Sequence, residues 1–96
     1  MSLTFRRTEI DNKGAFIAFD GEEKAGVMTY SRLNDDVVII DHTETMESHR
    51  GQGVGRELVE HAVSWARGSN QQLMPLCPFA KSVFDETPDW ADVRFG

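Results

Sequence analysis

The sequence predicts one α/β (α+β) domain whose sheet is mostly antiparallel and ends in one parallel strand pair. Apolar stretches separated by turn-forming residues fill the first half of the chain, a helical periodicity follows, and a short apolar segment comes after the helix. A chain of 96 residues can bury one modest core. Because we find no repeat, low-complexity tract or linker, we expect residues 1–96 to form a single domain.

The first half of the chain predicts four strands that form an antiparallel meander. The predicted strands are residues 3–10, 15–19, 24–33 and 37–46. Turn-forming residues separate them at positions 11–14, 20–21 and 34–36. Apolar side chains of the second strand alternate between its two faces, so this strand is apolar on both sides. We therefore expect it to lie inside the sheet.

A helix follows, since apolar residues recur at four-residue steps from Val54 to Ala66. This pattern predicts a helix over residues 54–67, with Gly68 at its left-handed C-terminal cap. Residues 71–76 predict a strand parallel to the one before the helix, because a helical crossover joins the two. Pro78 suits the first turn of a second helix that runs to about residue 86, and residues 89–93 predict a last helical turn.

Composition excludes several classes of protein. A net charge of -6 argues against general nucleic-acid binding, which needs clustered Lys and Arg. The single Cys77 cannot close an intramolecular disulfide or contribute to a zinc site built from Cys pairs. Residues 1–20 lack the apolar block of a signal peptide, and no stretch approaches the roughly 20 apolar residues of a membrane span. We expect a cytoplasmic protein that binds neither membrane nor nucleic acid.

Alternating glycines distinguish the segment 49–56, which lies between a predicted strand and a predicted helix. Such a turn exposes successive N–H groups, and the helix N-terminus adds partial positive charge, so the segment favours a phosphate. A dinucleotide fingerprint would need glycine where Arg56 or Leu58 stands, and the P-loop spacing is absent. A tight turn without a ligand is the alternative, but the flanking Arg50 and Arg56 favour an anion site.

The glycine segment resembles the acetyl-CoA signature of the GNAT-type N-acetyltransferases, which is Arg or Gln, two residues, Gly, one residue, and Gly or Ala. Arg50, Gly53 and Gly55 match this signature. The chain is similar to the small single-domain branch of the family at two further motifs, residues 42–44 (His-Thr-Glu) and 75–79 (Pro-Leu-Cys-Pro-Phe). It resembles that branch also in its closing Pro-Asp-Trp and lacks the helices and last strand pair of larger members.

The resemblance implies a GNAT-like fold whose parallel strand pair flanks a CoA-binding crossover helix, with acetyl-CoA as cosubstrate and no metal. Eight residues are implied in cofactor binding: Met46, Arg50, Gly51, Gln52, Gly53, Val54, Gly55 and Arg56. The implied activity is transfer of an acetyl group to the amine of a small molecule or a protein, and it sets no oligomeric state. A noncatalytic acyl-CoA-binding or regulatory module remains the alternative.

Three residues are candidates for catalysis. His42 and Glu44 are two apart on a strand, which predicts one face shared with Ile40 and Met46. His42 could accept the proton of an amine, and Glu44 could hold the cation or orient the ring; the alternative is a pair of solvated polar residues at a strand end. Cys77 precedes Pro78, so as an N-cap it would feel the helix dipole and have a lowered pKa and an accessible thiol.

Some other residues have plainer interpretations. An unpaired cysteine is often a small buried apolar residue, which is the alternative for Cys77. We expect His61, Trp65 and Trp90 to serve packing. His49 could touch a phosphate or be an exposed loop histidine.

Overall fold

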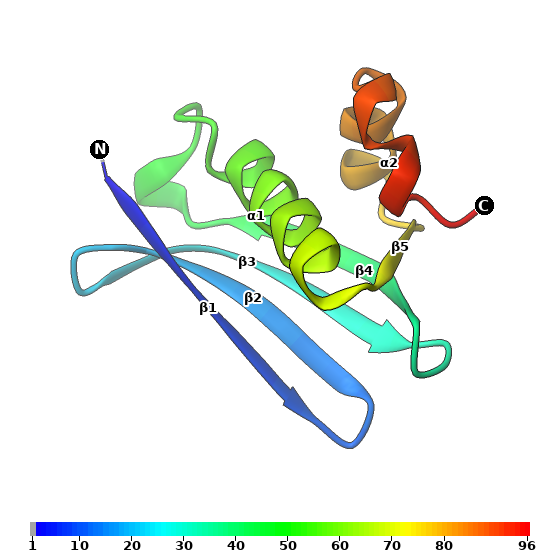
Figure 1. Cartoon of the computed structure of the whole chain (residues 1–96). Helices are drawn as coiled ribbons and strands as arrows, with labels where there is room; N and C mark the ends of the chain where they lie inside the picture. Colours follow the sequence, from blue (N-terminus) through cyan, green and yellow to red (C-terminus); the bar gives the residue numbers. More distant parts are fainter. Residues whose placement is uncertain (1) are drawn as a thin grey trace.

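The computed structural model describes residues 2–96, which form a five-stranded sheet in the order β1-β2-β3-β4-β5 (Figure 1). The strands are β1 (Leu3–Ile10), β2 (Lys13–Asp20), β3 (Glu23–Arg32), β4 (Val37–Thr45) and β5 (Gln72–Pro75). The helices are α1 (Val54–Ser69) and α2 (Pro78–Asp85), with short 3-10 turns η1 (Glu47–His49) and η2 (Pro88–Val93). Neighbours from β1 to β4 are antiparallel, whereas β4 and β5 are parallel. The predicted fold class is confirmed.

The start of β2 and the end of α1 differ from the predictions, because Asp11, Asn12 and Asn70 adopt left-handed conformations. Asp11 and Asn12 have φ angles of 51° and 68°, so they make a two-residue hairpin turn by themselves. Lys13 and Gly14 therefore belong to β2 and not to the turn. The predicted cap at Gly68 is wrong, since α1 continues to Ser69 and Asn70 closes it with a φ of 57°.

Both helices lie on one side of the sheet, which we call the helix face (Figure 1). Phe16 and Met28 of the sheet are fully buried there against Leu58 of α1, and the same core contains Phe84 of α2. The opposite side, which we call the open face, carries the other apolar row of β2, such as Ile17, half-buried. β2 is thus apolar on both sides and lies inside the sheet, as predicted.

A β-bulge interrupts the pairing of β4 with β3. Tyr30 pairs with Ile40, but the preceding Thr29 pairs with His42, so Asp41 is an extra residue on β4. A bulge of this kind reverses the faces on which all later side chains of the strand lie. The alternation that holds up to Ile40 therefore changes phase at Asp41.

The predicted row of Ile40, His42 and Glu44 on one face is wrong for this reason. Ile40 is buried on the helix face, whereas His42 and Glu44 lie exposed on the open face. Thr43 and Thr45 take the positions on the helix face, where both are half-buried.

The parallel strands separate soon after they pair. Their pairing ends where Ile40 meets Pro75, and the chain then leaves the sheet towards α2. The N–H groups of Leu76 and Cys77 both donate to the Ile40 carbonyl, at 3.2 and 3.0 Å. Within residues 2–96 no strand pairs with the outer edge of β4 beyond this point, so residues 41–45 border a gap in the sheet. None of the described helices is long and apolar enough to cross a membrane.

Candidate functional site

The glycine segment forms an open turn at the N-terminus of α1. Gly51 and Gly53 have φ angles of 78° and 80°, a left-handed conformation that L side chains adopt only with strain. A Cβ at either position would meet no atom within 4 Å, so the backbone there is approachable. Gly53 is the N-cap and brings no side chain to the first N–H groups of α1. These donors are therefore available to an anion.

A cavity of about 260 Å³ lies between this turn, the end of β4 and α2. Its lining residues are Thr43, Thr45, Gly51, Gly53, Val54, Gly55, Arg56 and Phe79. Phe79 approaches Gly55 so closely that a Cβ at Gly55 would lie 2.9 Å from its ring. The cavity thus offers N–H donors at the turn and an apolar wall, which suits an anionic group attached to a flexible chain.

Five of the eight predicted cofactor residues line this cavity, namely Gly51, Gly53, Val54, Gly55 and Arg56. Met46, Arg50 and Gln52 lie in the same connecting segment but outside the lining. Arg56 is exposed, and its guanidinium is 3.5 Å from the exposed carboxylate of Glu86. An exposed pair of this kind contributes little, so Arg56 remains able to turn towards an anion.

Cys77 is the N-cap of α2, as predicted, and its thiol lies beside Thr43 of β4. The Cys77 Sγ and the Thr43 Oγ1 are 3.5 Å apart, close enough for a hydrogen bond. Burial by itself raises the pKa of this thiol, but the N–H groups of Ala80 and Phe79 and the hydroxyl and N–H of Thr43 outweigh it and hold the pKa below the usual value. The site therefore stabilises negative charge on sulfur.

The predicted accessibility of the thiol is wrong, because Cys77 is only 3% exposed. Cys77 packs into the core between β4 and α2, together with the fully buried Ala80. Sequence reasoning also missed Thr43, since simple alternation assigns it to the face opposite Ile40. The bulge at Asp41 reverses that assignment and turns Thr43 towards Cys77 and the cavity.

His42 and Glu44 do not reach the cavity side of the sheet. They lie on the open face, where Asp41 is also exposed and accepts a hydrogen bond from Ser31 at 3.3 Å. His42 and Glu44 belong to the stretch of β4 that borders the gap in the sheet. Thr43 lies on the same stretch but faces the cavity, so it lies on the opposite side of the gap. The structure places Cys77 next to Thr43, which lines the cavity, and leaves His42 and Glu44 on the other face.

Three of the remaining residues singled out by sequence, His61, Trp65 and Trp90, serve packing as expected. His61 stacks on Phe5 with 4.5 Å between ring centroids, and Trp65 and Trp90 pack against the core. His49 is buried, which excludes the exposed-loop interpretation, and its ring contacts Asp20.

A larger hollow of about 620 Å³ lies at the other end of α1. It is lined by Asp36, Ala66, Arg67, Asn70, Gln71, Gln72, Asp92 and Val93. The helix presents carbonyl groups here, which disfavour anions, and Arg67 is already held by Asp92 at 2.9 Å. The smaller cavity at the glycine turn is therefore the better anion site.

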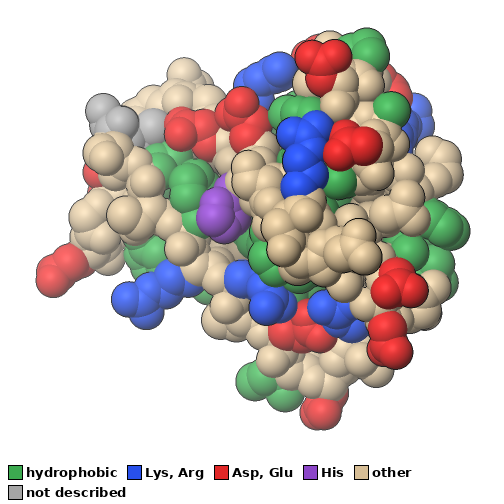
Figure 2. All heavy atoms as spheres, in the orientation of Figure 1, with side chains coloured by type: hydrophobic (Ala, Val, Ile, Leu, Met, Phe, Trp, Pro, Cys, Tyr) green, Lys and Arg blue, Asp and Glu red, His purple; other side chains and the backbone are tan. Residues whose placement is uncertain are grey.

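Charge on the side of the molecule seen in Figure 1 is mixed. Figure 2 shows that Lys and Arg side chains lie among Asp and Glu side chains there and form no continuous basic patch. An anionic ligand on this side depends on local donors such as those of the turn.

Comparisons with known proteins agree with this geometry. The family model described as GCN5-related N-acetyl-transferase matches residues 15–93. A GCN5-like protein from Staphylococcus aureus is 30% identical in sequence, with a TM-score of 0.69 over 95% of this chain and 88% of that chain. No curated protein matches the sequence.

Two more distant structures share the fold. An acetyltransferase from Bacillus subtilis, solved in complex with CoA, is 16% identical with a TM-score of 0.69 and covers 88% of this chain and 74% of its own. A ribosomal-protein-alanine N-acetyltransferase from Brucella melitensis is 16% identical with a TM-score of 0.69, and the match covers 81% of this chain and 62% of that enzyme. Since the family model spans most of the sequence and the glycine turn has the expected geometry, the chain belongs to the GCN5-related N-acetyltransferase family.

Proposed function

We propose that this protein transfers an acetyl group from acetyl-CoA to the amine of a small molecule or a protein. The observation that carries the proposal is the continuity between the glycine turn, the cavity behind it, and the Cys77–Thr43 pair beside the gap next to β4. An anion, a flexible chain and a reacting thioester need these three features in this order. A cytoplasmic location fits a thiol that must stay reduced to act.

The cofactor would be bound mainly through the backbone. The N–H groups from Gly51 to Gly55 hold the pyrophosphate at the start of α1, with Arg50 and Arg56 near enough in sequence to add charge and Gln52 to add a donor. The pantetheine arm passes between the apolar wall of the cavity and the edge of β4 near Met46. The thioester then lies at the gap, next to Thr43 and Cys77.

The chemistry requires an amine nitrogen to attack the thioester carbon while the carbon–sulfur bond breaks and its electron pair leaves with the CoA sulfur. The donors around Cys77 stabilise its own thiolate, so the Cys77 thiol can give its proton to the CoA sulfur, on which negative charge develops. We assign Cys77 and Thr43 to this side of the reaction. Cys77 can act as a thiol acid towards the leaving sulfur or lie beside it, and direct attack by the amine needs no acyl-cysteine.

The amine would approach from the open face. Asp41 and Glu44 are exposed there beside the gap, so their carboxylates attract a cationic amine. His42 lies between them in sequence and is the candidate to accept the proton that the amine must lose. The Brucella enzyme has the same fold, and its name describes transfer to the alanine of a ribosomal protein, which is an amine acceptor.

A pair of substitutions at Gly53 tests the cofactor site. Gly53→Asp carries the strain of the left-handed φ and puts a carboxylate beside the first N–H groups of α1, where it competes with the pyrophosphate for these donors. Gly53→Asn has nearly the same size and tolerates the left-handed φ equally well, but carries no charge. CoA should raise the thermal midpoint of the wild-type protein and of Gly53→Asn clearly more than that of Gly53→Asp.

Equal shifts in folded Gly53→Asp and Gly53→Asn would mean that the anion binds elsewhere. Activity is tested separately by following release of free CoA from acetyl-CoA with a panel of amines that includes a polyamine, a lysine peptide and a peptide with a free N-terminus. If CoA binds but no amine of the panel accelerates release, the alternative of a noncatalytic acyl-CoA-binding module is favoured.

A further inference from the structure

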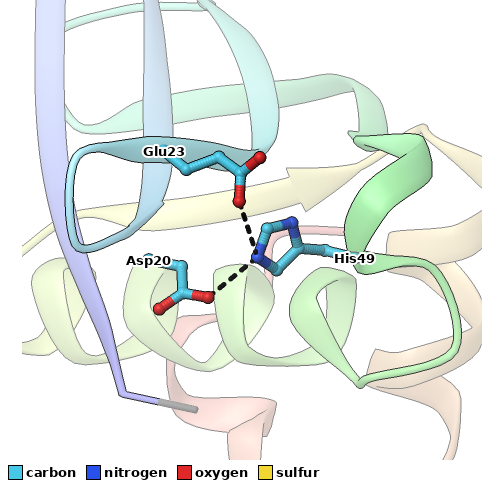
Figure 3. A group of neighbouring side chains, drawn as sticks. All are labelled: Asp20, Glu23 and His49. Carbon is cyan, nitrogen blue, oxygen red and sulfur yellow. Dashed lines mark hydrogen bonds and ion pairs between the residues drawn. The ribbon is translucent and has the colours of Figure 1, made fainter.

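A second cluster of functional side chains lies outside the cavity, at the turn between β2 and β3. Asp20 ends β2, Glu23 begins β3, and His49 ends η1, directly before the glycine segment. The His49 Nε2 is 2.9 Å from a carboxylate oxygen of Asp20 and 3.7 Å from one of Glu23. Figure 3 shows both carboxylates turned towards this ring nitrogen.

The ring of His49 is fixed in place. It is only 4% exposed, and its other nitrogen, Nδ1, is 2.8 Å from the Ser48 hydroxyl. Ionised carboxylates are acceptors only, so the electron pair of a bare Nε2 would face two negative groups. Something positive must lie between them, and this is either a proton on Nε2 or a metal cation. In one neutral tautomer Ser48 donates to Nδ1 and Nε2 carries the proton; in the other, Nδ1 donates to Ser48 and Nε2 is free to bind a cation.

Charge favours a cation over a single proton. With a neutral ring the cluster carries two negative charges, and among residues 2–96 the side chains of Asp20 and Glu23 form ion pairs with His49 alone. A proton on Nε2 can make a hydrogen bond to Asp20, but Glu23 at 3.7 Å is beyond hydrogen-bonding distance. A divalent cation can contact both carboxylates at once.

We propose that Asp20, Glu23 and His49 form a binding site for a divalent transition-metal ion of the Zn²⁺ class. The three ligand atoms lie within 4.8 Å of one another. Ligand atoms bonded to zinc at about 2.0 to 2.2 Å in a tetrahedron are roughly 3.4 Å apart. The two distances to His49, 2.9 and 3.7 Å, are close to this spacing, and the two carboxylate oxygens lie within 4.8 Å of each other. One imidazole and two carboxylates suit Zn²⁺ better than Mg²⁺ or Ca²⁺, which prefer oxygen alone.

The remaining coordination positions would face solvent. The side chains of Asp20 and Glu23 are 39% and 63% exposed, so water can complete the coordination and the ion can enter without unfolding. Sequence reasoning predicts no metal here, because the three ligands come from separate segments with no motif spacing. An ion at this site would also link the β2–β3 turn to the residue that precedes Arg50.

The test is a calorimetric titration of untagged protein with zinc chloride in the absence of CoA. The wild-type chain should bind one Zn²⁺ per molecule. His49→Gln, Asp20→Asn and Glu23→Gln should each lower the affinity by at least the roughly 10- to 100-fold that loss of an outer-shell partner costs. Glu22→Gln is the matched control, since Glu22 is an exposed carboxylate of the same turn outside the cluster, and it should bind like wild type.

Two outcomes overturn the proposal. Absence of zinc binding to the folded wild-type protein would leave His49 with a structural role as the hydrogen-bonding partner of Asp20. Binding that is weakened as much by Glu22→Gln as by Asp20→Asn would mean diffuse attraction to acidic residues. The two carboxylate variants change exposed side chains, so they test the site even if His49→Gln does not fold. The titration contains no CoA, so its result is independent of the proposed acetyltransferase activity.

Discussion

Gly55→Ala is the sharpest test of the cavity, because the family signature admits alanine at this position, but in this chain the added methyl group would meet the Phe79 ring on one wall of the cavity. The new Cβ would lie 2.9 Å from two ring carbons of Phe79, a separation that real Cβ atoms do not show. Phe79 is 42% exposed, so its ring can move aside. The substitution should therefore displace the cavity wall and leave the fold intact.

The magnitude follows from two opposing effects. Alanine improves on glycine inside a helix by about 0.5 to 1 kcal/mol, which offsets part of the cost of moving the Phe79 ring. For the bound state, one extra methyl in a filled site costs about 1 to 3 kcal/mol, and 1.4 kcal/mol corresponds to about tenfold in affinity. Gly55→Ala should thus change the unfolding free energy by less than about 1 kcal/mol, but weaken CoA binding by about tenfold or more.

Gly68→Ala is the matched control, since Gly68 is also in α1 and a Cβ there would meet nothing within 4 Å. It should raise the unfolding free energy by about 0.5 to 1 kcal/mol and leave CoA affinity unchanged. Each kcal/mol corresponds to a rise of about 4 to 8 °C in the thermal midpoint. Calorimetric titration with CoA and thermal unfolding measure both quantities. If folded Gly55→Ala binds CoA as tightly as Gly68→Ala does, the cofactor does not occupy the cavity beside Phe79.

Four other expectations concern single residues. Alkylation of Cys77 by iodoacetamide should be slow because the thiol is 3% exposed, but its rate should rise at a lower pH than for a free cysteine, and CoA should slow it further. His42→Ala should lower the rate of acetyl transfer by about 10² to 10⁴-fold and leave CoA affinity unchanged, and an unaltered pH–rate profile would reject the proton-acceptor role. Burial lowers the pKa of His61, so the unfolded chain binds the proton more readily; stability should fall as the pH drops below about 6.5, and it should fall less in His61→Phe. Glu9→Ala should cost about 1 to 2 kcal/mol in urea unfolding, because that carboxylate accepts hydrogen bonds from side chains of β1 and β3; an unchanged midpoint would show that these bonds contribute nothing net.

The features that sequence predicts well are those set by neighbouring residues. Strand order from β1 to β4 is predictable because each connection is a short turn, and such turns join antiparallel neighbours only. The parallel pairing of β5 follows from the helix that separates it from β4. The open turn at Gly51 and Gly53 follows from glycine spacing just before a helix, and the N-cap position of Cys77 from Pro78.

Features that depend on distant segments could not be predicted. Cys77 is buried in a core built from distant segments and contacts Thr43, which is 34 residues away, so its helix-capping position does not reveal its exposure. The contact between His49 and Asp20 spans 29 residues and joins a loop to a hairpin end. No spacing rule relates such positions, and a pattern of apolar residues does not record where polar side chains of separate segments meet.

The bulge at Asp41 decides which chemistry lies on which face of β4. In a regular strand His42 and Glu44 would continue the row of the buried Ile40, beneath the helices, where an unpaired charge is costly. The extra residue avoids this cost by turning both side chains to the open face, and it turns Thr43 to the cavity in exchange. Because β5 has ended by then, the same stretch of β4 is reachable from both faces. In the reaction proposed above, the cofactor on the helix face and the amine on the open face would therefore meet across one strand without competing for the same space.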